Sequence, residues 1–298
     1  MSDWRVIVGD CIEGMRSLEA GSVHCCVTSP PYFQQRDYGV EGQMGLEENP
    51  DAFIARLVAV FGEVRRVLRD DGTLWINIGD SIYSGNGQPK GDDPKSPSRN
   101  FSRRFYRWLD RPGMGLPKKS LLGIPWRLAH ALQADGWTLR SEIIWHRRGS
   151  FTQAGINDRP YTTHETVFLL SKLRRYYFDP AARDFGTVWD VPHEQTVRGH
   201  SAAFPAALPE RCILAGCPRG GTVLDPFGGS GTTAGVAIKH GRNAILCELN
   251  PAYAVMMPER VLAVAGATPD MFREAAELPI HSHRAPSACI RQGTASRT

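Results

Sequence analysis

The stretch from Val223 to Thr233, which reads VLDPFGGSGTT, decides the fold class of this 298-residue chain. It combines an apolar strand, a glycine-rich turn and the start of a helix that is expected to run to about His240. Glycines let the backbone approach a ligand closely, and the free N–H groups at a helix start favour a carboxylate or a phosphate. The next strand, Asn243 to Cys247, ends at Glu248. A carboxylate there can accept hydrogen bonds from both ribose hydroxyls of an adenosine cofactor. The order of these pieces predicts βαβ units in an α/β fold.

Three classes of nucleotide site compete for this turn. A P-loop requires Gly-Lys-Ser/Thr, and Gly231-Thr232-Thr233 has no lysine, which argues against phosphate binding. A dinucleotide fold would place its glycine turn at the start of a domain with a second phosphate site, and neither is evident. S-adenosylmethionine fits better, because its carboxylate can use the turn amides while Glu248 takes the ribose. An ordinary βαβ turn with a chance cluster of glycines stays open as a structural explanation.

A second motif, Ser29-Pro30-Pro31-Tyr32, follows the apolar run Val23 to Val27. The prolines fix φ and lack N–H donors, so the carbonyls of Ser29 and Pro30 can face a ligand instead of a neighbouring strand. The Ser29 hydroxyl and the flat Tyr32 ring suit a planar base that carries an exocyclic amine. Taken alone, the tetrapeptide is explained equally well as a structural turn.

Together the two motifs resemble the β-group of the amino-methylating DNA methyltransferases. In that family an Asp/Asn/Ser-Pro-Pro-Tyr/Phe tetrapeptide comes first, a variable segment follows, and the cofactor turn comes late. The resemblance covers most of residues 4–262 and includes Gly9-Asp10-Cys11, His164-Glu165 and Phe204-Pro205. It implies a Rossmann-like, S-adenosylmethionine-dependent methyltransferase fold with a circularly permuted motif order and an inserted target-recognition region.

The resemblance also implies roles for single residues. Ser29 and the Pro30 carbonyl would hold the target amine, next to Pro31, and Tyr32 would stack on the extruded base. Glu248 would bind the cofactor ribose and Asp10 the adenine amine. The other expected cofactor contacts are Cys11, Phe204, Pro205, Asp225, Pro226, Phe227, Gly229, Ser230, Gly231, Thr232, Leu249 and Asn250. Each has a structural alternative: Asp10 could be a helix cap, Phe204 a core residue and Glu248 a surface acid.

Positive charge is concentrated between the two motifs. Residues 84–148 hold 13 Lys/Arg against 5 Asp/Glu, a local net charge of +8, while the whole chain carries +4. Such a surface is typical of a protein that faces phosphates, although a solvated loop would have the same composition. Aromatic residues between the arginines of residues 101–108 favour nucleic acid. The residues expected to contact DNA are Arg103, Arg104, Arg107, Lys118, Lys119, Arg147 and Arg148.

The expected organisation has four parts. These are a catalytic part at 1–146 with a mobile basic loop at 84–112, a target-recognition region at 147–200, a cofactor-binding part at 201–264, and a flexible tail at 265–298. Periodic apolar residues predict a helix over Ala52–Leu68. Residues 147–200 are expected to be irregular, with strand-like pieces at Thr166–Leu170 and Arg175–Phe178.

The seven cysteines do not indicate a metal site or a disulfide framework. Their odd number and the lack of any Cys-x-x-Cys predict reduced, cytosolic thiols, and no zinc motif is complete, so no metal is expected. No apolar run reaches membrane-spanning length, which predicts a cytoplasmic, DNA-associated protein of bacterial or phage type without a membrane partner. No Pro-Cys dipeptide occurs, which removes the usual nucleophile of carbon-5 cytosine methylation.

Within the family, Ser at the first position of the tetrapeptide is more typical of cytosine N4, and Asp of adenine N6. We therefore expect a site-specific enzyme that moves a methyl group from S-adenosyl-L-methionine to N4 of cytosine in double-stranded DNA. Base flipping and direct in-line attack would bring the amine to the donor. Adenine-N6 methylation is the alternative, and a catalytically inactive DNA-binding module is a remote one. A homodimer and a cognate restriction endonuclease are both open as partners.

Overall fold

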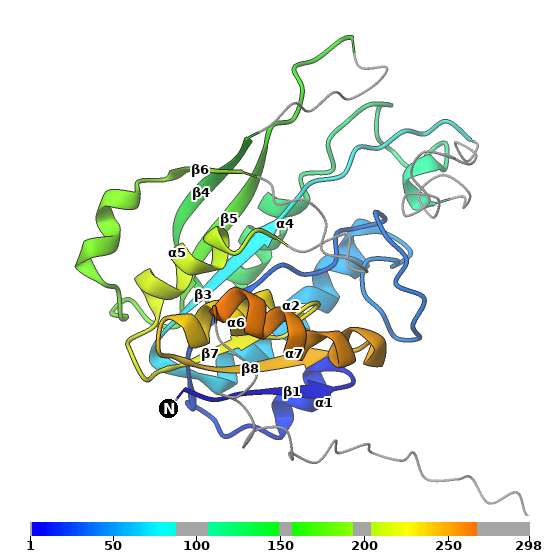
Figure 1. The fold of residues 1–298 in the computed structure, drawn as a ribbon. Helices are drawn as coiled ribbons and strands as arrows, with labels where there is room; N and C mark the ends of the chain where they lie inside the picture. The colour runs from blue at the N-terminus through cyan, green and yellow to red at the C-terminus, as the bar shows by residue number, and fades with distance from the viewer. Residues whose placement is uncertain (1, 88–106, 149–156, 193–203, 267–298) are drawn as a thin grey trace, which may run out of the picture.

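The computed structural model describes residues 2–87, 107–148, 157–192 and 204–266. These residues form an eight-stranded sheet in the order β1-β8-β7-β2-β3-β5-β4-β6 (Figure 1). Strand β5 runs antiparallel to its neighbours β3 and β4, whereas the other neighbouring pairs are parallel. The strands are β1 (Trp4–Val8), β2 (Val23–Thr28), β3 (Leu68–Ile78), β4 (Thr138–Arg148), β5 (His164–Ser171), β6 (Val188–Pro192), β7 (Thr222–Asp225) and β8 (Asn243–Glu248).

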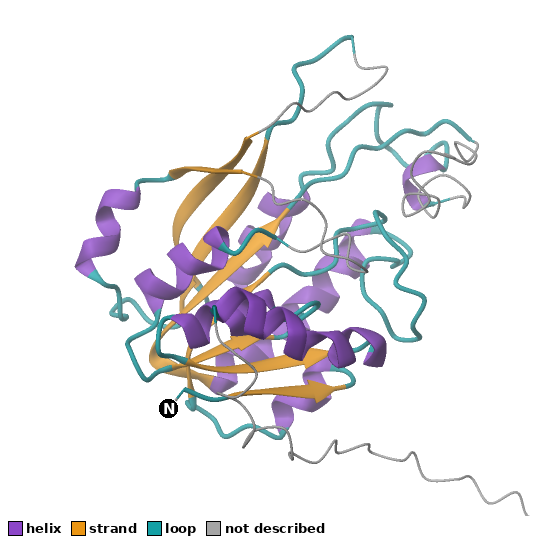
Figure 2. Cartoon of the chain, viewed as in Figure 1, coloured by secondary structure: helices purple, strands orange, loops and turns teal. Residues whose placement is uncertain are grey.

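Helices cover both faces of the sheet (Figure 2). On one face lie α1 (Cys11–Arg16), α2 (Pro50–Val67) and α4 (Ile124–Ala134), which share a hydrophobic core. On the other lie α5 (Ala207–Gly216), α6 (Thr232–Lys239) and α7 (Pro251–Ala265), with a second core. Short 3₁₀ helices occur at Trp108–Asp110 and Pro180–Phe185. A parallel sheet requires cover on both faces, because its central strands are apolar throughout.

Helix α2 shows how local sequence sets an element. The Asn49 side chain accepts a hydrogen bond from the Ala52 N–H, and Pro50 occupies the first turn, where its missing N–H costs nothing. Apolar side chains recur with helical period along one face and are buried. Leu68 then adopts an extended conformation and begins β3. The helix predicted over Ala52–Leu68 is confirmed, with a start two residues earlier.

The parallel strands β1, β8, β7 and β2 bring the sequence motifs to one edge of the sheet. Asp10 follows β1, Glu248 ends β8, the glycine turn follows β7, and Ser29 follows β2. Chain order reverses between β7 and β2, and open α/β sheets bind ligands at the carboxyl ends beside such a switch point. The predicted α/β fold with its permuted motif order is confirmed.

Residues 147–200 agree with the expectation in part. The strand-like piece predicted at Thr166–Leu170 is confirmed as part of β5, but β5 and β6 belong to the central sheet, and Arg175–Phe178 is not a strand. Strand β6 was missed because it is short and ends at Pro192, and only Trp189 and Val191 of its five residues are buried. Trp189 stacks on Trp75 of β3, with ring centroids 6.2 Å apart. A role of 147–200 in target recognition stays a prediction.

Among the described residues, no helix is long and apolar enough to cross a membrane.

Candidate active site

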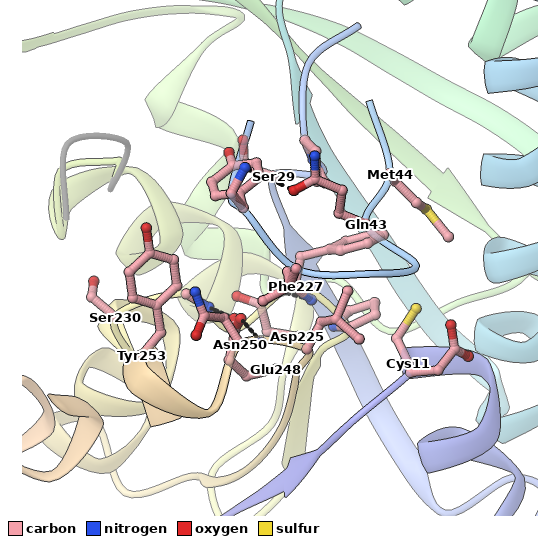
Figure 3. Close-up of a pocket in the computed structure, with 18 of the residues that line it drawn as sticks. Cys11, Ser29, Gln43, Met44, Asp225, Phe227, Ser230, Glu248, Asn250 and Tyr253 are labelled. Carbon is pink, nitrogen blue, oxygen red and sulfur yellow. Dashed lines mark hydrogen bonds between the residues drawn. The ribbon is translucent and has the colours of Figure 1, made fainter. Parts of the chain in front are cut away.

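One cavity lies at the carboxyl edge of the sheet, between the tetrapeptide and the glycine turn. It has a volume of about 120 Å³ and opens to solvent. Figure 3 shows Ser29 and Gln43 on one side of this cavity and Glu248, Asn250 and Tyr253 on the other. The expected residues that line it are Asp10, Cys11, Ser29, Pro31, Phe204, Asp225, Pro226, Phe227, Gly229, Ser230, Thr232, Glu248, Leu249 and Asn250.

Glu248 is held by two backbone amides at the end of β8. Its Oε2 accepts from Gly229 N and its Oε1 from Asn250 N, each at 2.8 Å. The residue is only 9% exposed, and this burial raises the pKa of the carboxyl above its usual value. A carboxylate has about four acceptor positions. Two therefore remain for hydroxyl donors from the cavity that Glu248 lines.

Asp225 connects the strand before the tetrapeptide to the glycine turn. Its Oδ1 accepts from Thr28 Oγ1 at 2.7 Å and from Phe227 N at 3.0 Å, and its Oδ2 accepts from Thr233 Oγ1 at 2.6 Å. Burial raises the pKa of this carboxyl. Asp225 thus joins the end of β2 to the turn after β7, which fixes the tetrapeptide relative to the glycine turn.

Two glycines of the turn serve packing. A Cβ on Gly228 would lie 2.9 Å from Leu246 Cβ, which real Cβ atoms do not tolerate. Gly231 has φ +89°, a left-handed conformation that disfavours other residues, and its Cα faces Met257 and Val261 of α7. The expected cofactor contact at Gly231 is therefore not among the cavity-lining residues, whereas Gly228, which was not predicted, is.

Asp10 caps α1 and also lines the cavity. Its Oδ1 accepts from Ile12 N at 2.8 Å and from Glu13 N at 3.1 Å. The helix-cap alternative is therefore confirmed, and the contact with an adenine amine stays a prediction. Burial raises the pKa of the neighbouring Cys11 thiol to about 12, so this cysteine is an apolar wall and not a nucleophile. Pro205 is buried beside Phe204 but does not line the cavity.

On the tetrapeptide side, Ser29 and Pro31 line the cavity, whereas the predicted site residues Pro30 and Tyr32 are not among its lining residues. The Tyr32 ring packs so closely on Gly79 that a Cβ there would lie 2.7 Å from a ring carbon. Its hydroxyl lies 2.5 Å from Glu165 Oε2. Burial and then the Glu165 charge hold the pKa of Tyr32 well above its usual value. The ring is therefore a neutral, rigid surface.

The segment after the tetrapeptide forms a wall that sequence reasoning missed. Five of its residues line the cavity, together with Tyr253 of α7. Arg56 of α2 holds this segment by donating to the carbonyls of Gly42 and Gln43. The only sequence signal is the spacing of Gly39, Gly42 and Gly45, all with positive φ. The five are Tyr38, Val40, Gly42, Gln43 and Met44.

The expected DNA-contacting residues differ in their surroundings. Arg103 and Arg104 lie outside the described residues. Arg107 forms an enclosed ion pair with Asp110, with an Nε–Oδ2 distance of 2.9 Å, so it is not an open phosphate contact. The guanidinium of Arg147 likewise binds Glu165, at 3.1 Å. Among the exposed ones, Lys118 has no ion pair within the described part, Lys119 pairs with Asp158, and Arg148 with Asp190.

Comparison with known proteins identifies the family of this chain. A family model described as DNA methylase, for the N6/N4 methyltransferases, matches residues 23–258. The chain belongs to this family. The Type II methyltransferase M.Cfr9I of Citrobacter freundii is 45% identical over 263 residues, covering 85% of this chain and 86% of that protein. M.SmaI of Serratia marcescens is 44% identical over 270 residues, covering 87% and 90%.

Solved structures agree on the fold. The PvuII DNA methyltransferase, which is cytosine-N4-specific, superposes with a TM-score of 0.66 at 19% identity, covering 89% of this chain and 92% of that one. The DNA modification methylase TTHA0409 of Thermus thermophilus, complexed with S-adenosyl-L-methionine, gives 0.61 at 27% identity, covering 89% and 95%. The protein is therefore a DNA methyltransferase of the amino-methylating family, which uses S-adenosyl-L-methionine. The cavity fits that group, because a buried acceptor carboxylate and a glycine turn face an apolar wall.

Proposed function

We propose that this enzyme methylates N4 of cytosine at a specific site in double-stranded DNA. The observation that carries the proposal is that Ser29 lines the same cavity as Glu248 and the glycine turn. A hydroxyl at the first position of the tetrapeptide is typical of the cytosine-N4 branch of the family. One cavity can therefore hold a methyl donor on one side and an extruded cytosine on the other.

Adenine N6 is the second candidate. The Escherichia coli DNA adenine methyltransferase YhdJ is 28% identical over 263 residues. Both bases present a planar ring with an exocyclic amine, so the same pocket chemistry serves either.

The cofactor would lie along the strand ends. Glu248, fixed by the Gly229 and Asn250 amides, would accept from the ribose hydroxyls, and the unused oxygen of Asp10 would face the adenine amine. Phe227 and Phe204 give the apolar surface for the ring and the methionine portion. When bound, S-adenosyl-L-methionine supplies a methyl group on a sulfonium centre, whose C–S electron pair leaves with sulfur as the N–C bond forms.

The protein's residues prepare the nucleophile. The lone pair of an exocyclic amine is delocalised into the ring, so the nitrogen is weakly nucleophilic. Ser29 Oγ and the Pro30 carbonyl would accept its two N–H groups and draw the nitrogen toward tetrahedral geometry, which frees the lone pair. Alignment with the methyl group would supply up to about 7–11 kcal/mol. The surplus nitrogen proton leaves to water. Stacking on the rigid Tyr32 ring offsets the few kcal/mol that base flipping costs.

DNA would bind at the carboxyl edge of the sheet, where the cavity lies. Lys118, Lys119 and Arg148 are exposed cations that can contact phosphates. We assign target recognition to residues 147–200, with β5 and β6 as their support. The Type II names of its relatives support a cognate restriction endonuclease as partner, and a homodimer is a further proposal.

Digestion of methylated DNA to nucleosides, followed by mass spectrometry, tests the assignment. DNA from cells that express the protein should contain N4-methylcytosine, and DNA from cells that express Ser29→Ala should not. N6-methyladenine in place of N4-methylcytosine would reject cytosine and support the second candidate. Absence of both modified nucleosides, together with bound DNA and no bound S-adenosyl-L-methionine, would indicate the inactive DNA-binding module.

A further inference from the structure

A row of polar side chains crosses four neighbouring strands and ends at the tetrapeptide. Ser29 and Tyr32 follow β2, Asn77 lies on β3, Glu165 on β5 and Arg147 on β4. The strands are adjacent in this same order, β2-β3-β5-β4. No residue of this row after Tyr32 is close to the tetrapeptide in sequence, so the sheet pairing brings them together.

Glu165 accepts the hydrogen bonds of this row. Its Oε2 lies 2.5 Å from the Tyr32 hydroxyl and accepts from Asn77 Nδ2 at 3.3 Å, and its Oε1 accepts from Arg147 Nη1 at 3.1 Å. The Tyr32 hydroxyl also lies 3.1 Å from Asn77 Oδ1, but its single proton points to Glu165, because that contact is shorter and its acceptor is charged. The Asn77 amide is fixed too, because Nδ2 faces two acceptors, Glu165 and the Thr166 carbonyl. Asn77 Oδ1 is thereby turned toward the tetrapeptide.

This arrangement decides where the Ser29 proton goes. Ser29 Oγ lies 3.4 Å from Asn77 Oδ1. This oxygen can only accept, because the Asn77 NH₂ faces Glu165 and the Thr166 carbonyl, and the Tyr32 proton does not compete for it. A hydroxyl has one proton and two lone pairs. With its proton directed into the row, Ser29 presents lone pairs to the cavity that it lines.

We infer that Glu165 is a positioning residue that, through Asn77 and Tyr32, makes the Ser29 hydroxyl an acceptor for the target amine. The inference rests on the proposed role of Ser29. An exocyclic amine offers its N–H groups as donors, so a Ser29 hydroxyl with its proton in the cavity would oppose it. Arg147 orients the carboxylate, and its side chain and that of Glu165 are only 19% and 15% exposed. Arg147 thus acts on the target side as a brace and not as a phosphate contact.

Glu165→Gln tests the direction of the hydrogen bonds with almost no change in shape. Arg147 requires an acceptor, so the Gln oxygen should face Arg147 and the NH₂ should face Tyr32 and Asn77. This NH₂ donor would reverse the direction of the hydrogen bonds along the row. The single-turnover rate of methyl transfer should fall at least about tenfold, the effect of one misdirected hydrogen bond. Affinity for S-adenosyl-L-methionine and for DNA should stay within about twofold of the parent.

Asn77→Leu removes the acceptor for Ser29 without touching the Arg147–Glu165 ion pair, and should lower the same rate by about tenfold. Thr73→Val is the matched control. Thr73 is a fully buried polar residue on the same strand, bonded to the Gly216 carbonyl at 3.2 Å and outside the row. It should lower the denaturation midpoint and leave the rate unchanged.

The rates of the variants distinguish failure of the positioning role of Glu165 from failure of the proposed role of Ser29. A rate within about threefold of the parent for either Glu165→Gln or Asn77→Leu overturns the inference. So does a rate loss that only follows lost cofactor or DNA affinity, or that Thr73→Val reproduces. If Ser29→Ala also keeps the parental rate, the proposed role of Ser29 fails. If Ser29→Ala is slow while the other two are not, only the positioning role of Glu165 fails.

Discussion

The two sides of the cavity are built differently. On the proposed cofactor side, the backbone amides of Gly229 and Asn250 fix one carboxylate, Glu248. On the proposed target side, side chains from separate parts of the sheet bond to one another, as Tyr32 after β2 and Glu165 of β5 do across 133 residues of sequence. A backbone-built site is specified by a local stretch of chain, whereas a site built from side chains depends on the pairing of the whole sheet. The comparison predicts that mutations on the two sides affect different quantities.

The largest effect should come from Ser29→Ala on the target side. Removal of the proposed acceptor for the target amine should lower the single-turnover rate by about a thousandfold, the upper range for one preorganised group that acts on the reacting atoms. Quenched reactions with a radiolabelled methyl donor measure this rate. A rate within about threefold of the parent would show that Ser29 does not act in methyl transfer, and the proposed target side would then be wrong.

Arg107 tests whether the target side depends on long-range braces. Its guanidinium pairs with Asp110, whose side chain is 1% exposed, and its Nη1 donates to the Gln34 carbonyl just after the tetrapeptide, at 3.2 Å. Arg107→Ala leaves Asp110 enclosed without its cation and should cost about 3 kcal/mol of unfolding free energy. Urea denaturation measures this cost.

Lys118→Ala is the control for Arg107. This exposed lysine should leave the unfolding free energy unchanged and make the salt dependence of DNA binding shallower by about one log–log unit. The opposite result, an Arg107→Ala variant with parental stability and a shallower salt dependence of DNA binding, would support Arg107 as a DNA contact.

The smallest expected effect is a pH-dependent change in the affinity for S-adenosyl-L-methionine, caused by Glu248 on the proposed cofactor side. Burial raises the pKa of its carboxyl, so it takes up a proton at higher pH than an exposed glutamate does. Protonation removes the charged acceptor. Affinity for S-adenosyl-L-methionine should therefore be constant above this raised pKa and fall as the pH is lowered through it. Glu248→Gln should bind about tenfold more weakly at neutral pH and lose this dependence. A parental pH profile in the variant would assign the titration to another group.

The sequence predicted well which residues of the proposed cofactor side lie together, because its signals are local. Val223–Thr233 and Glu248 show a strand, a turn and an acid within 26 residues, and the structure places them in one cavity. The target side was predicted only at Ser29 to Tyr32. Glu165 and Asn77 meet there because β5 pairs antiparallel with β3, which no local pattern encodes. The Arg107–Asp110 pair, by contrast, lies three residues apart and could have been found in the sequence.

The most direct test of the division between the two sides is a calorimetric titration of S-adenosyl-L-methionine into the parent, Ser29→Ala and Glu248→Ala. Ser29→Ala should bind within about twofold of the parent, because we propose that Ser29 contacts the target amine and not the cofactor. Glu248→Ala should lose about 1–3 kcal/mol, since it leaves polar partners in the cavity unsatisfied. An equal loss in both variants, or none in Glu248→Ala, would contradict the account.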